Sequence, residues 1–406
     1  MMKQRENLAI FGGEKSIKKA MPKRIAFGDE EVRALNGAVE FYSSQDNDPG
    51  YYGKYEHQYC SMFSDYMAGG YTVAVATGTA ALYVAIAALE LPPNSHIVMS
   101  PITDPGSFNA AVLQGFKVSL ADTQSNSLNT SWEQIEKVLT PQTSAILLVH
   151  CAGINADIEN IAKHAKARGI KLIEDCSQSP GAEYNGRKLG TFGDICALST
   201  MYRKSLASGG SGGLVYTTNK DLHYKCLSYK DRGKDFESPD YQERNAEAYL
   251  FPALNWNTNE LSCAIGVASL NRLDDTIKKR ANFCKVITTL MQSSQLCQIP
   301  NFIEGTSPFF LTVYLKDAKI DKEKFCDALL AEGVELNPHY RFVISQWPWA
   351  QPYLTEYKHT PNAQIARDSS FNIYLNENYT EETAEAIFEA MMKVESYFLN
   401  STSTEM

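Results

Sequence analysis

The sequence lacks several features that would place it in a membrane, nucleic-acid or metal-binding class. No apolar run reaches membrane-spanning length, and the start, MMKQRENLAIFGG, lacks the apolar core of a secretion signal. The net charge of −9 includes no basic stripe, which argues against a nucleic-acid partner. The nine cysteines are scattered singly, without a C-x-x-C pair or a Cys/His cluster at metal spacing. We therefore expect a cytoplasmic protein with reduced thiols, no membrane segment and no metal.

What is present predicts a large α/β fold. The 406 residues, 44% of them hydrophobic, allow an extensive core and favour two domains. Strands that are apolar along their length alternate with helices, which implies a mostly parallel sheet covered by helices on both faces. Ligands of such sheets bind at the carboxyl ends of the strands. The strands are expected at 72–76, 96–100, 117–122, 144–150 and 171–175.

The pattern changes after Asn255. Two helices are expected near 260–270 and 274–291, followed by an apolar strand at 309–315 and further helices near 322–332 and 381–399. We therefore predict a large domain over residues 1–256 and a smaller C-terminal α+β domain over residues 257–406.

The first motif with possible chemistry is the turn Thr77-Gly78-Thr79-Ala80, between a strand and a helix. Free amides at a helix N-terminus, together with the helix dipole, favour a bound phosphate. An ordinary strand-to-helix turn with a threonine cap is the alternative. No Gly-Lys-Ser/Thr follows, so the turn is not a Walker loop.

The second motif is the segment IEDCSQSPG, in which Asp175 ends an apolar strand. A carboxylate there can keep the pyridine nitrogen of pyridoxal 5′-phosphate (PLP) protonated, so that the ring accepts electrons. Gln178, three residues on, is placed to reach the phenolic oxygen of the ring. Alternatively, Asp175 only caps a following helix.

The third motif is LSTMYRKSLASGGSGG, where Lys204 follows a strand that ends near Ser199. The glycines allow the backbone to approach a ligand closely, and the Ser199 hydroxyl can add a phosphate donor. A partly desolvated lysine near cations has a lowered pKa, as an amine that forms a Schiff base requires. A flexible glycine hairpin is the other interpretation.

The order of these motifs resembles that of fold-type I PLP enzymes. The residues within the motifs resemble those of one family more closely. The chain resembles the DegT/DnrJ/EryC1/StrS family of PLP-dependent sugar aminotransferases along most of its length. The resemblance is carried by LAIFGGEKSIKKAMP, ATGTAAL, H-x-x-G-x-x-A-D at His150–Asp157, E-D-x-x-Q at Glu174–Gln178, and Ser-x4-Lys at Ser199–Lys204.

The resemblance implies a role for each candidate residue. Lys204 would hold PLP as a Schiff base and move a proton, and Asp175 would pair with the ring nitrogen. Gln178 would bond the phenolic oxygen. Asn255 would reach the phosphate of the neighbouring subunit's cofactor in a homodimer with shared active sites. The residues implied to hold the phosphate are Gly78, Thr79, Ala80 and Ser199, while His339 and Tyr340 fall where a substrate-side pair often occurs.

The chain departs from the family pattern at three places. Asp104, in SPITDPGSFNA, replaces an aromatic residue that stacks on the cofactor ring. Either Phe108 moves in, or Asp104 contacts the substrate, or another group covers the ring face. The glycine turn after Lys204 lacks the usual acidic residue and is one residue longer, and Asn257 replaces an arginine.

The leading hypothesis is an aminotransferase that moves nitrogen from an amino acid to a keto sugar. The resemblance implies glutamate as the amino acid and a nucleotide-linked sugar. A PLP- or PMP-dependent sugar dehydratase is the second. Such relatives carry histidine in place of the lysine, so Lys204 argues against it. A non-catalytic sensor or assembly partner is the third. We interpret His150 as a structural residue at a strand end.

Overall fold

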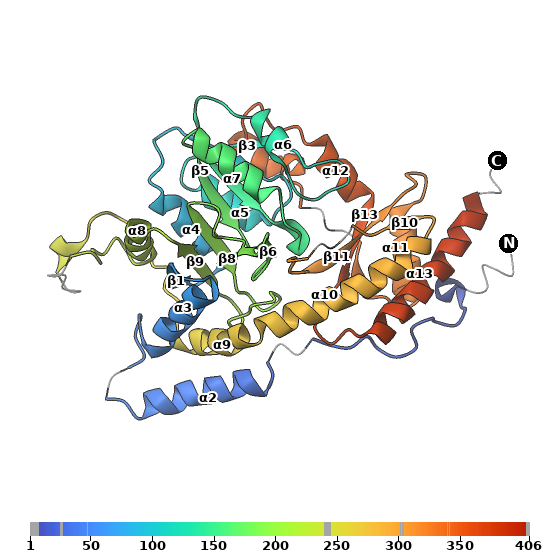
Figure 1. Ribbon diagram of the computed structural model, residues 1–406, viewed down its shortest axis with the longest axis horizontal. Helices are drawn as coiled ribbons and strands as arrows, with labels where there is room; N and C mark the ends of the chain where they lie inside the picture. The colour runs from blue at the N-terminus through green and yellow to red at the C-terminus, as the bar shows by residue number, and fades with distance from the viewer. Residues whose placement is uncertain are drawn as a thin grey trace.

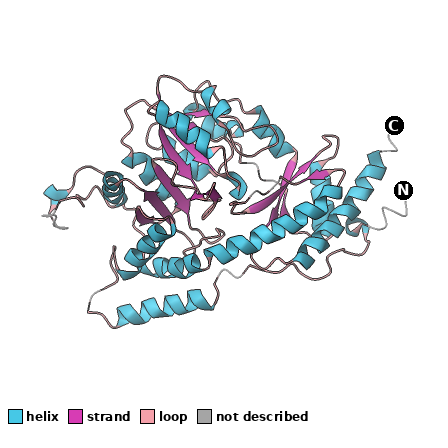
Figure 2. Ribbon diagram, in the orientation of Figure 1, coloured by secondary structure: helices cyan, strands magenta, loops and turns pink. Residues whose placement is uncertain are grey.

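The centre of the molecule is a seven-stranded sheet (Figures 1 and 2), seen in a computed structural model that describes residues 8–24, 27–46, 48–238, 245–300, 302, 304–338, 340 and 342–402. The strand order is β1-β9-β8-β5-β4-β2-β3. The strands are β1 (Tyr71–Val75), β2 (His96–Met99), β3 (Lys117–Leu120), β4 (Thr143–Val149), β5 (Lys171–Asp175), β8 (Ile195–Ser199) and β9 (Gly213–Thr217).

Only β9 runs against the other six strands of this sheet. It pairs antiparallel with both β1 and β8, whereas β3, β2, β4, β5 and β8 pair in parallel. The predicted mostly parallel sheet is therefore confirmed. Because six strands share one direction, the residues that follow β1, β2, β4, β5 and β8 meet at one carboxyl edge.

Helices cover both faces of the sheet, and β4 shows why its sequence is apolar throughout. Leu147 and Val149 pack into a cluster with α4 (Gly78–Ala88) and α5 (Pro105–Val112). Their neighbours Ile146 and Leu148 pack on the opposite face, in a cluster that includes residues of α3 (Lys54–Tyr66), α6 (Trp132–Glu136) and α7 (Ile158–Ala167). Alternate side chains of a strand point to opposite faces, so both sets must be apolar. Helix α8 (Lys220–Lys230) follows β9.

The C-terminal part contains a second, four-stranded antiparallel sheet of order β10-β11-β13-β12. Its strands are β10 (Cys297–Gln298), β11 (Phe310–Leu315), β12 (Leu336–Asn337) and β13 (Ser370–Tyr374). The helices of this part are α9 (Glu260–Asn271), α10 (Leu273–Leu290), α11 (Lys322–Ala331), α12 (Pro361–Asp368) and α13 (Glu381–Thr402). Across the described residues, no helix is long and apolar enough to cross a bilayer, and the cytoplasmic location stays a prediction.

The N-terminal segment packs on the small sheet, and helix α9 packs on the large sheet. Leu8 and Met21 pack in the cluster of the small sheet, although they belong to the N-terminal segment. Cys263 and Leu270 of α9 pack in a cluster of the large sheet. Helix α2 (Asp29–Ser43) lies outside the main body and packs against α9 (Figure 1). The predicted boundary between residues 256 and 257 stays a prediction.

Candidate active site

Asp175 ends β5 and is 2% exposed. The Ser107 hydroxyl donates to its Oδ2 across 2.9 Å, and the Ser177 amide donates to its Oδ1 across 3.0 Å. The Thr103 hydroxyl donates in turn to Ser107 Oγ across 2.9 Å. Each carboxylate oxygen can accept a further bond, so the group is oriented and still available to a ligand N–H. No helix starts in residues 176–182, so the helix-cap interpretation is wrong.

Lys204 is 9% exposed, and its Nζ lies 4.6 Å from the centre of the Phe309 ring. Burial lowers the pKa of Lys204, while the charges of Asp175 and Asp104 act in the opposite direction. The structure thus brings Lys204 close to both carboxylates that the sequence singled out. A lysine with a lowered pKa presents more of the neutral amine that attacks a carbonyl.

Two arginines hold the loop that carries Lys204. Arg24 donates to the Lys204 carbonyl across 2.5 Å and to the Tyr202 carbonyl across 3.1 Å. Arg280 donates to Ser205 Oγ across 2.9 Å. Both guanidinium groups pair with Glu377, at 3.6 Å and 3.1 Å respectively. The lysine loop is therefore fixed by the N-terminal segment, α10 and the C-terminal part together, which the sequence did not predict.

The turn after β1 combines a capped helix start with unused donors. Thr77 caps α4 by accepting from the Ala80 amide across 2.9 Å. Among the described residues, no group accepts from the Gly78 or Thr79 amide, as expected for the first helical positions. A β-carbon on Gly78 would lie 2.5 Å from Ser199 Cβ, so glycine is required for Ser199 to pack here. The Ala80 amide, predicted as a phosphate donor, already has the Thr77 hydroxyl as its partner.

Gln178 links the site to the C-terminal part. Its Oε1 accepts from the Ala152 amide across 2.7 Å, and its Nε2 donates to the Tyr340 hydroxyl across 3.3 Å. Removal from water raises the pKa of Tyr340, so its hydroxyl keeps its proton. Tyr340 therefore lies beside Gln178, and His339 is outside the described residues.

Asp104 is exposed at the start of α5, where its Oδ1 accepts from the Gly106 amide across 2.8 Å. Phe108, on the same helix, is fully buried. Its ring packs edge-on against those of Trp347 and Trp349, with ring centres 6.2 Å and 5.6 Å apart. Because α5 turns Phe108 into the core, the suggestion that it replaces the missing ring wall is wrong. Two alternatives remain: Asp104 contacts the substrate, or another group covers the face of the cofactor ring.

Asn255 is exposed and lies apart from the buried polar groups. Its Nδ2 donates to the Tyr51 hydroxyl across 3.1 Å, and its Oδ1 accepts from the Asn257 amide across 3.0 Å. The next residue, Trp256, accepts from the Ala76 amide across 2.9 Å, directly before the Thr77 turn. Asn255 is thus at the surface, near the beginning of the turn at Thr77.

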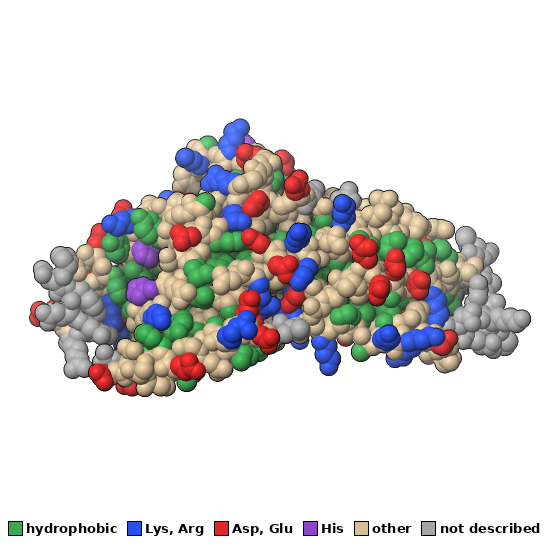
Figure 3. All heavy atoms as spheres, turned by 60° about the horizontal axis from the view of Figure 1, so that its bottom comes forward, with side chains coloured by type: hydrophobic (Ala, Val, Ile, Leu, Met, Phe, Trp, Pro, Cys, Tyr) green, Lys and Arg blue, Asp and Glu red, His purple; other side chains and the backbone are tan. Residues whose placement is uncertain are grey.

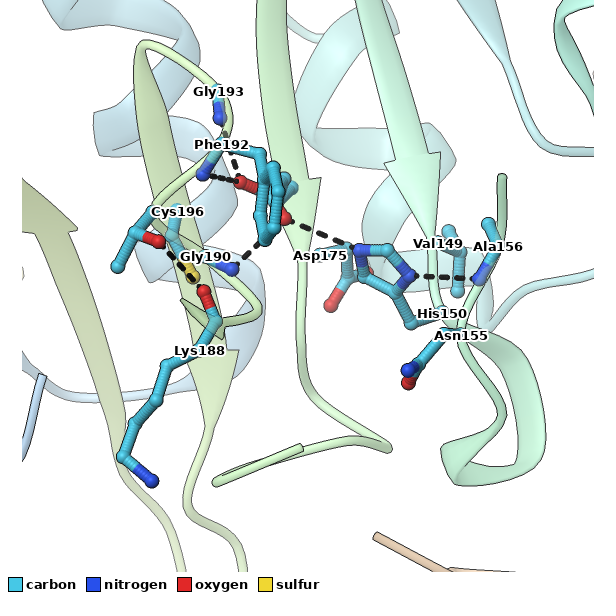
Figure 4. Close-up of polar contacts among 12 residues, drawn as sticks. Val149, His150, Asn155, Ala156, Asp175, Lys188, Gly190, Phe192, Gly193 and Cys196 are labelled. Carbon is cyan, nitrogen blue, oxygen red and sulfur yellow. Dashed lines mark hydrogen bonds and ion pairs between the residues drawn. The ribbon is translucent and has the colours of Figure 1, made fainter. Parts of the chain in front are cut away.

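His150 and Glu174 form a buried network behind Asp175 (Figure 4). His150 Nδ1 accepts from the Ala156 amide across 3.1 Å, and its Nε2 lies 3.3 Å from Glu174 Oε2. Glu174 also accepts from three backbone amides at 2.7–2.8 Å, those of Gly190, Phe192 and Gly193. These hydrogen bonds to Glu174 fit a structural role for the pair, which is the role that we expected for His150. Cys176 lies within 4.8 Å of both, but a metal ion would have to displace these donors.

A separate hollow of about 650 Å³ lies at the opposite, amino-terminal end of β5. Its lining includes Lys163, Lys171 and Asp194, of which the last two form an ion pair of 2.8 Å. None of the predicted site residues lines it. We therefore place the site at the carboxyl edge, where an oriented buried carboxylate, a lysine and unused amides converge.

These groups fit PLP by their chemistry. A phosphate needs donors such as the Gly78 and Thr79 amides, a ring nitrogen needs an oriented carboxylate, and an aldehyde needs an amine. The pairing of Asp175 with both Ser107 and Ser177 leaves it anchored without using its full capacity as an acceptor.

Comparison with known proteins identifies relatives with named activities. A GDP-perosamine synthase of Escherichia coli O157:H7 is 30% identical over 234 residues, which are 58% of this chain and 62% of that protein, so the match spans less than two thirds of the relative. An aminotransferase of Psychrobacter cryohalolentis superposes with a TM-score of 0.84 at 24% identity, covering 93% of this chain and 99% of that one.

A GDP-4-keto-6-deoxymannose-3-dehydratase, solved with a trapped PLP-glutamate geminal diamine, superposes with a TM-score of 0.82 at 21% identity, covering 92% of this chain and 100% of that one. At such identities the two structures show the fold alone, and they confirm the predicted one. The model of the DegT/DnrJ/EryC1/StrS aminotransferase family matches residues 38–392. This chain therefore belongs to the DegT/DnrJ/EryC1/StrS aminotransferase family, as its sequence motifs predicted.

Proposed function

We propose that this chain transfers an amino group from an amino acid, glutamate in the first instance, to a nucleotide-linked keto sugar. The observation that carries the proposal is a desolvated Lys204 beside the buried, doubly anchored Asp175. PLP, the cofactor of the family, supplies an electron-accepting ring when it is bound.

Each residue then has a defined task. Lys204 would hold the cofactor aldehyde through its Nζ and, once released, would accept a proton from the substrate Cα. Asp175 would keep the ring nitrogen protonated, and Gln178 would bond the phenolic oxygen of the ring. The phosphate would be held by Gly78, Thr79, Ala80 and Ser199. The Ala80 amide already donates to the Thr77 hydroxyl, so Ala80 would contribute as part of the first turn of the helix.

The substrate side is formed by Asp104 and Tyr340, with His339 as a further candidate. Asp104 presents a carboxylate near Lys204 and Tyr340, where sugar hydroxyl groups find an acceptor. The similarity to GDP-perosamine synthases supports a nucleotide-linked sugar as the acceptor.

We further propose a homodimer in which Asn255 reaches the partner's cofactor phosphate. Two large apolar side chains next to Asn255 are exposed: its hydrogen-bond partner Tyr51 and its chain neighbour Leu254, at 46% and 54%. Figure 3 shows the α2 side of the molecule, where apolar and charged side chains are intermixed. A second copy would cover such a surface.

The proposal is tested with the purified protein. We expect a yellow protein in which borohydride fixes the cofactor to Lys204, and loss of the yellow absorbance with release of 2-oxoglutarate when glutamate is added. Mass spectrometry of products from a panel of nucleotide-linked keto sugars then identifies the acceptor. A protein that takes up no PLP would contradict the proposal, and colour without response to any amino donor would favour a dehydratase or sensor.

A further inference from the structure

We propose that Arg367 binds a carboxylate of the amino donor, an inference that rests on the proposed aminotransferase function. Arg367 lies in α12 and is 3% exposed. Neither the family motifs nor the candidate residues of the sequence included it.

The guanidinium of Arg367 has no hydrogen-bond acceptor within the part of the chain that the structure describes. Its Nε is buried without a partner, and no described carboxylate pairs with the group. The buried Arg280 differs, because it bonds Ser205 and pairs with Glu377. An unpaired buried cation is costly, so a ligand anion that restored the missing bonds would be bound strongly.

Arg367 is close to the proposed active site. Its guanidinium carbon lies 5.0 Å from the centre of the Tyr340 ring, and the Tyr340 hydroxyl accepts from Gln178. Arg367 and Lys204 both lie near the thiol of Cys151. Burial raises the pKa of this thiol to about 12, while the charges of Arg367 and Lys204 act in the opposite direction. Arg367 is thus near the residue proposed to hold the phenolic oxygen.

Helix α12 holds Arg367 in a fixed place. The buried carboxylate of Asp122 accepts from the Asn362 and Ala363 amides at the start of the helix, both across 2.9 Å. At the other end, Lys322 Nζ donates to the Arg367 carbonyl across 2.9 Å. Arg367 is therefore presented by a helix anchored at both ends, as a pre-organised binding group requires.

The chemistry and position of Arg367 favour a carboxylate over a diphosphate. A guanidinium matches a carboxylate through two parallel hydrogen bonds. The α-carboxylate of an amino acid is attached to the reacting carbon, so it must lie within the buried site. The diphosphate of a nucleotide sugar is separated from the reacting carbon by the sugar ring and fits a more exposed position. A buried arginine beside Tyr340, which bonds Gln178, therefore meets the amino donor.

The test compares Arg367→Gln with wild type and with Arg168→Gln, a control at an arginine whose side chain is 38% exposed. We expect the apparent Kd for glutamate, followed by the absorbance of the PLP form, to rise about 10- to 100-fold in Arg367→Gln alone. Transfer of nitrogen from the pyridoxamine form to the keto sugar should stay near the wild-type rate. Equal losses in both half-reactions, or an unchanged Kd, would overturn the inference.

A second measurement does not depend on turnover or on the variant. In wild type, glutamate with its α-carboxylate converted to an amide lacks the group assigned to Arg367, and glutamate with its side-chain carboxylate converted to an amide is the control. We expect the α-amide to bind about 10- to 100-fold more weakly than glutamate, and binding of the α-amide as tight as that of glutamate would contradict the inference. Wild type that responds to no amino acid refutes the proposed function, whereas a normal response with an unaffected Arg367→Gln refutes this inference alone.

Discussion

Ser107 on α5 donates a 2.9 Å hydrogen bond to the buried carboxylate of Asp175 on β5. The contact connects two strand-end segments that are 68 residues apart in the sequence. Through Thr103, which donates to Ser107, it also ties Asp175 to the backbone that follows β2. The direction of the carboxylate is thus set by hydroxyl groups from the segment that also carries Asp104.

Substitution Asp175→Asn should leave PLP bound and nearly abolish turnover. Asparagine preserves the shape of the side chain, but it carries no negative charge to keep a proton on the ring nitrogen. Absorbance measures the bound cofactor, and release of 2-oxoglutarate measures turnover. Near-normal activity would refute the role given to Asp175.

Substitution Ser107→Ala should lower kcat by about 10- to 100-fold, since a hydrogen bond to a charged group contributes about 1.5–3 kcal/mol. The loss should be smaller than that of Asp175→Asn, because the Ser177 amide still holds Oδ1. Ser43→Ala, which removes an exposed hydroxyl from α2, is the control. Equal activity of Ser107→Ala and the control would show that this bond does not matter for turnover.

Substitution Asp104→Asn should lower the pKa of Lys204 further. Burial lowers that pKa and the Asp104 carboxylate opposes the effect, so removing the carboxylate leaves more neutral amine at a given pH. Asparagine can still cap α5. The rate of PLP attachment to cofactor-free protein, measured from about pH 6 to about pH 10, should reach half its maximum at a lower pH. Asp275→Asn, at a side chain 60% exposed, is the control, and a shift to higher pH would contradict the prediction.

Substitution Gly78→Ala should weaken PLP binding about tenfold or more, because even a cost of about 1.4 kcal/mol is a tenfold change. The added β-carbon would lie 2.5 Å from Ser199 Cβ, so Ser199 must move away from the turn. Fluorescence titration of cofactor-free protein measures the effect. The matched control is Gly50→Ala, where an added β-carbon meets no atom within 4 Å. Equal affinities in the two variants would argue against a phosphate site at this turn.

Substitution Glu174→Gln should destabilise the fold by about 1–3 kcal/mol, since an amide nitrogen would face backbone donors that now meet a carboxylate. Denaturant unfolding of the cofactor-free protein measures the loss. Glu136→Gln, at an exposed pair with Arg168, should cost about 0–1 kcal/mol. Similar costs for the two variants would show that the buried network contributes little.

The sequence predicted most strands of the large sheet within one or two residues, because strands buried on both faces are apolar at each position. It did not predict that β9 runs against its neighbours, since pairing depends on residues far apart in the chain. Helix α3, with its mixed polar residues, and the short helix α5 were also missed. The misjudgement of Phe108 followed from the missing α5, which turns that ring into the core.

For the site, Lys204, Asp175 and Gln178 stood out because each follows or ends a predicted strand in an order typical of one family. Ser107, Arg24, Arg280 and Arg367 gave no local signal. Arg24, for example, holds the carbonyl of a residue 180 positions away. Such contacts arise only when the fold brings distant segments together.

The reversed strand β9 also has a consequence for biosynthesis. Strand β1, which leads to the turn at Thr77, lies at the edge of the sheet, and β9 is its one neighbour there. On the ribosome, β2, β3, β4 and β5 can pair while β1 still waits for residues as far along as Thr217. The arginine anchors of the lysine loop also need Glu377, which is synthesised long after Lys204. Capture of the cofactor is thus a late event in the life of the nascent chain.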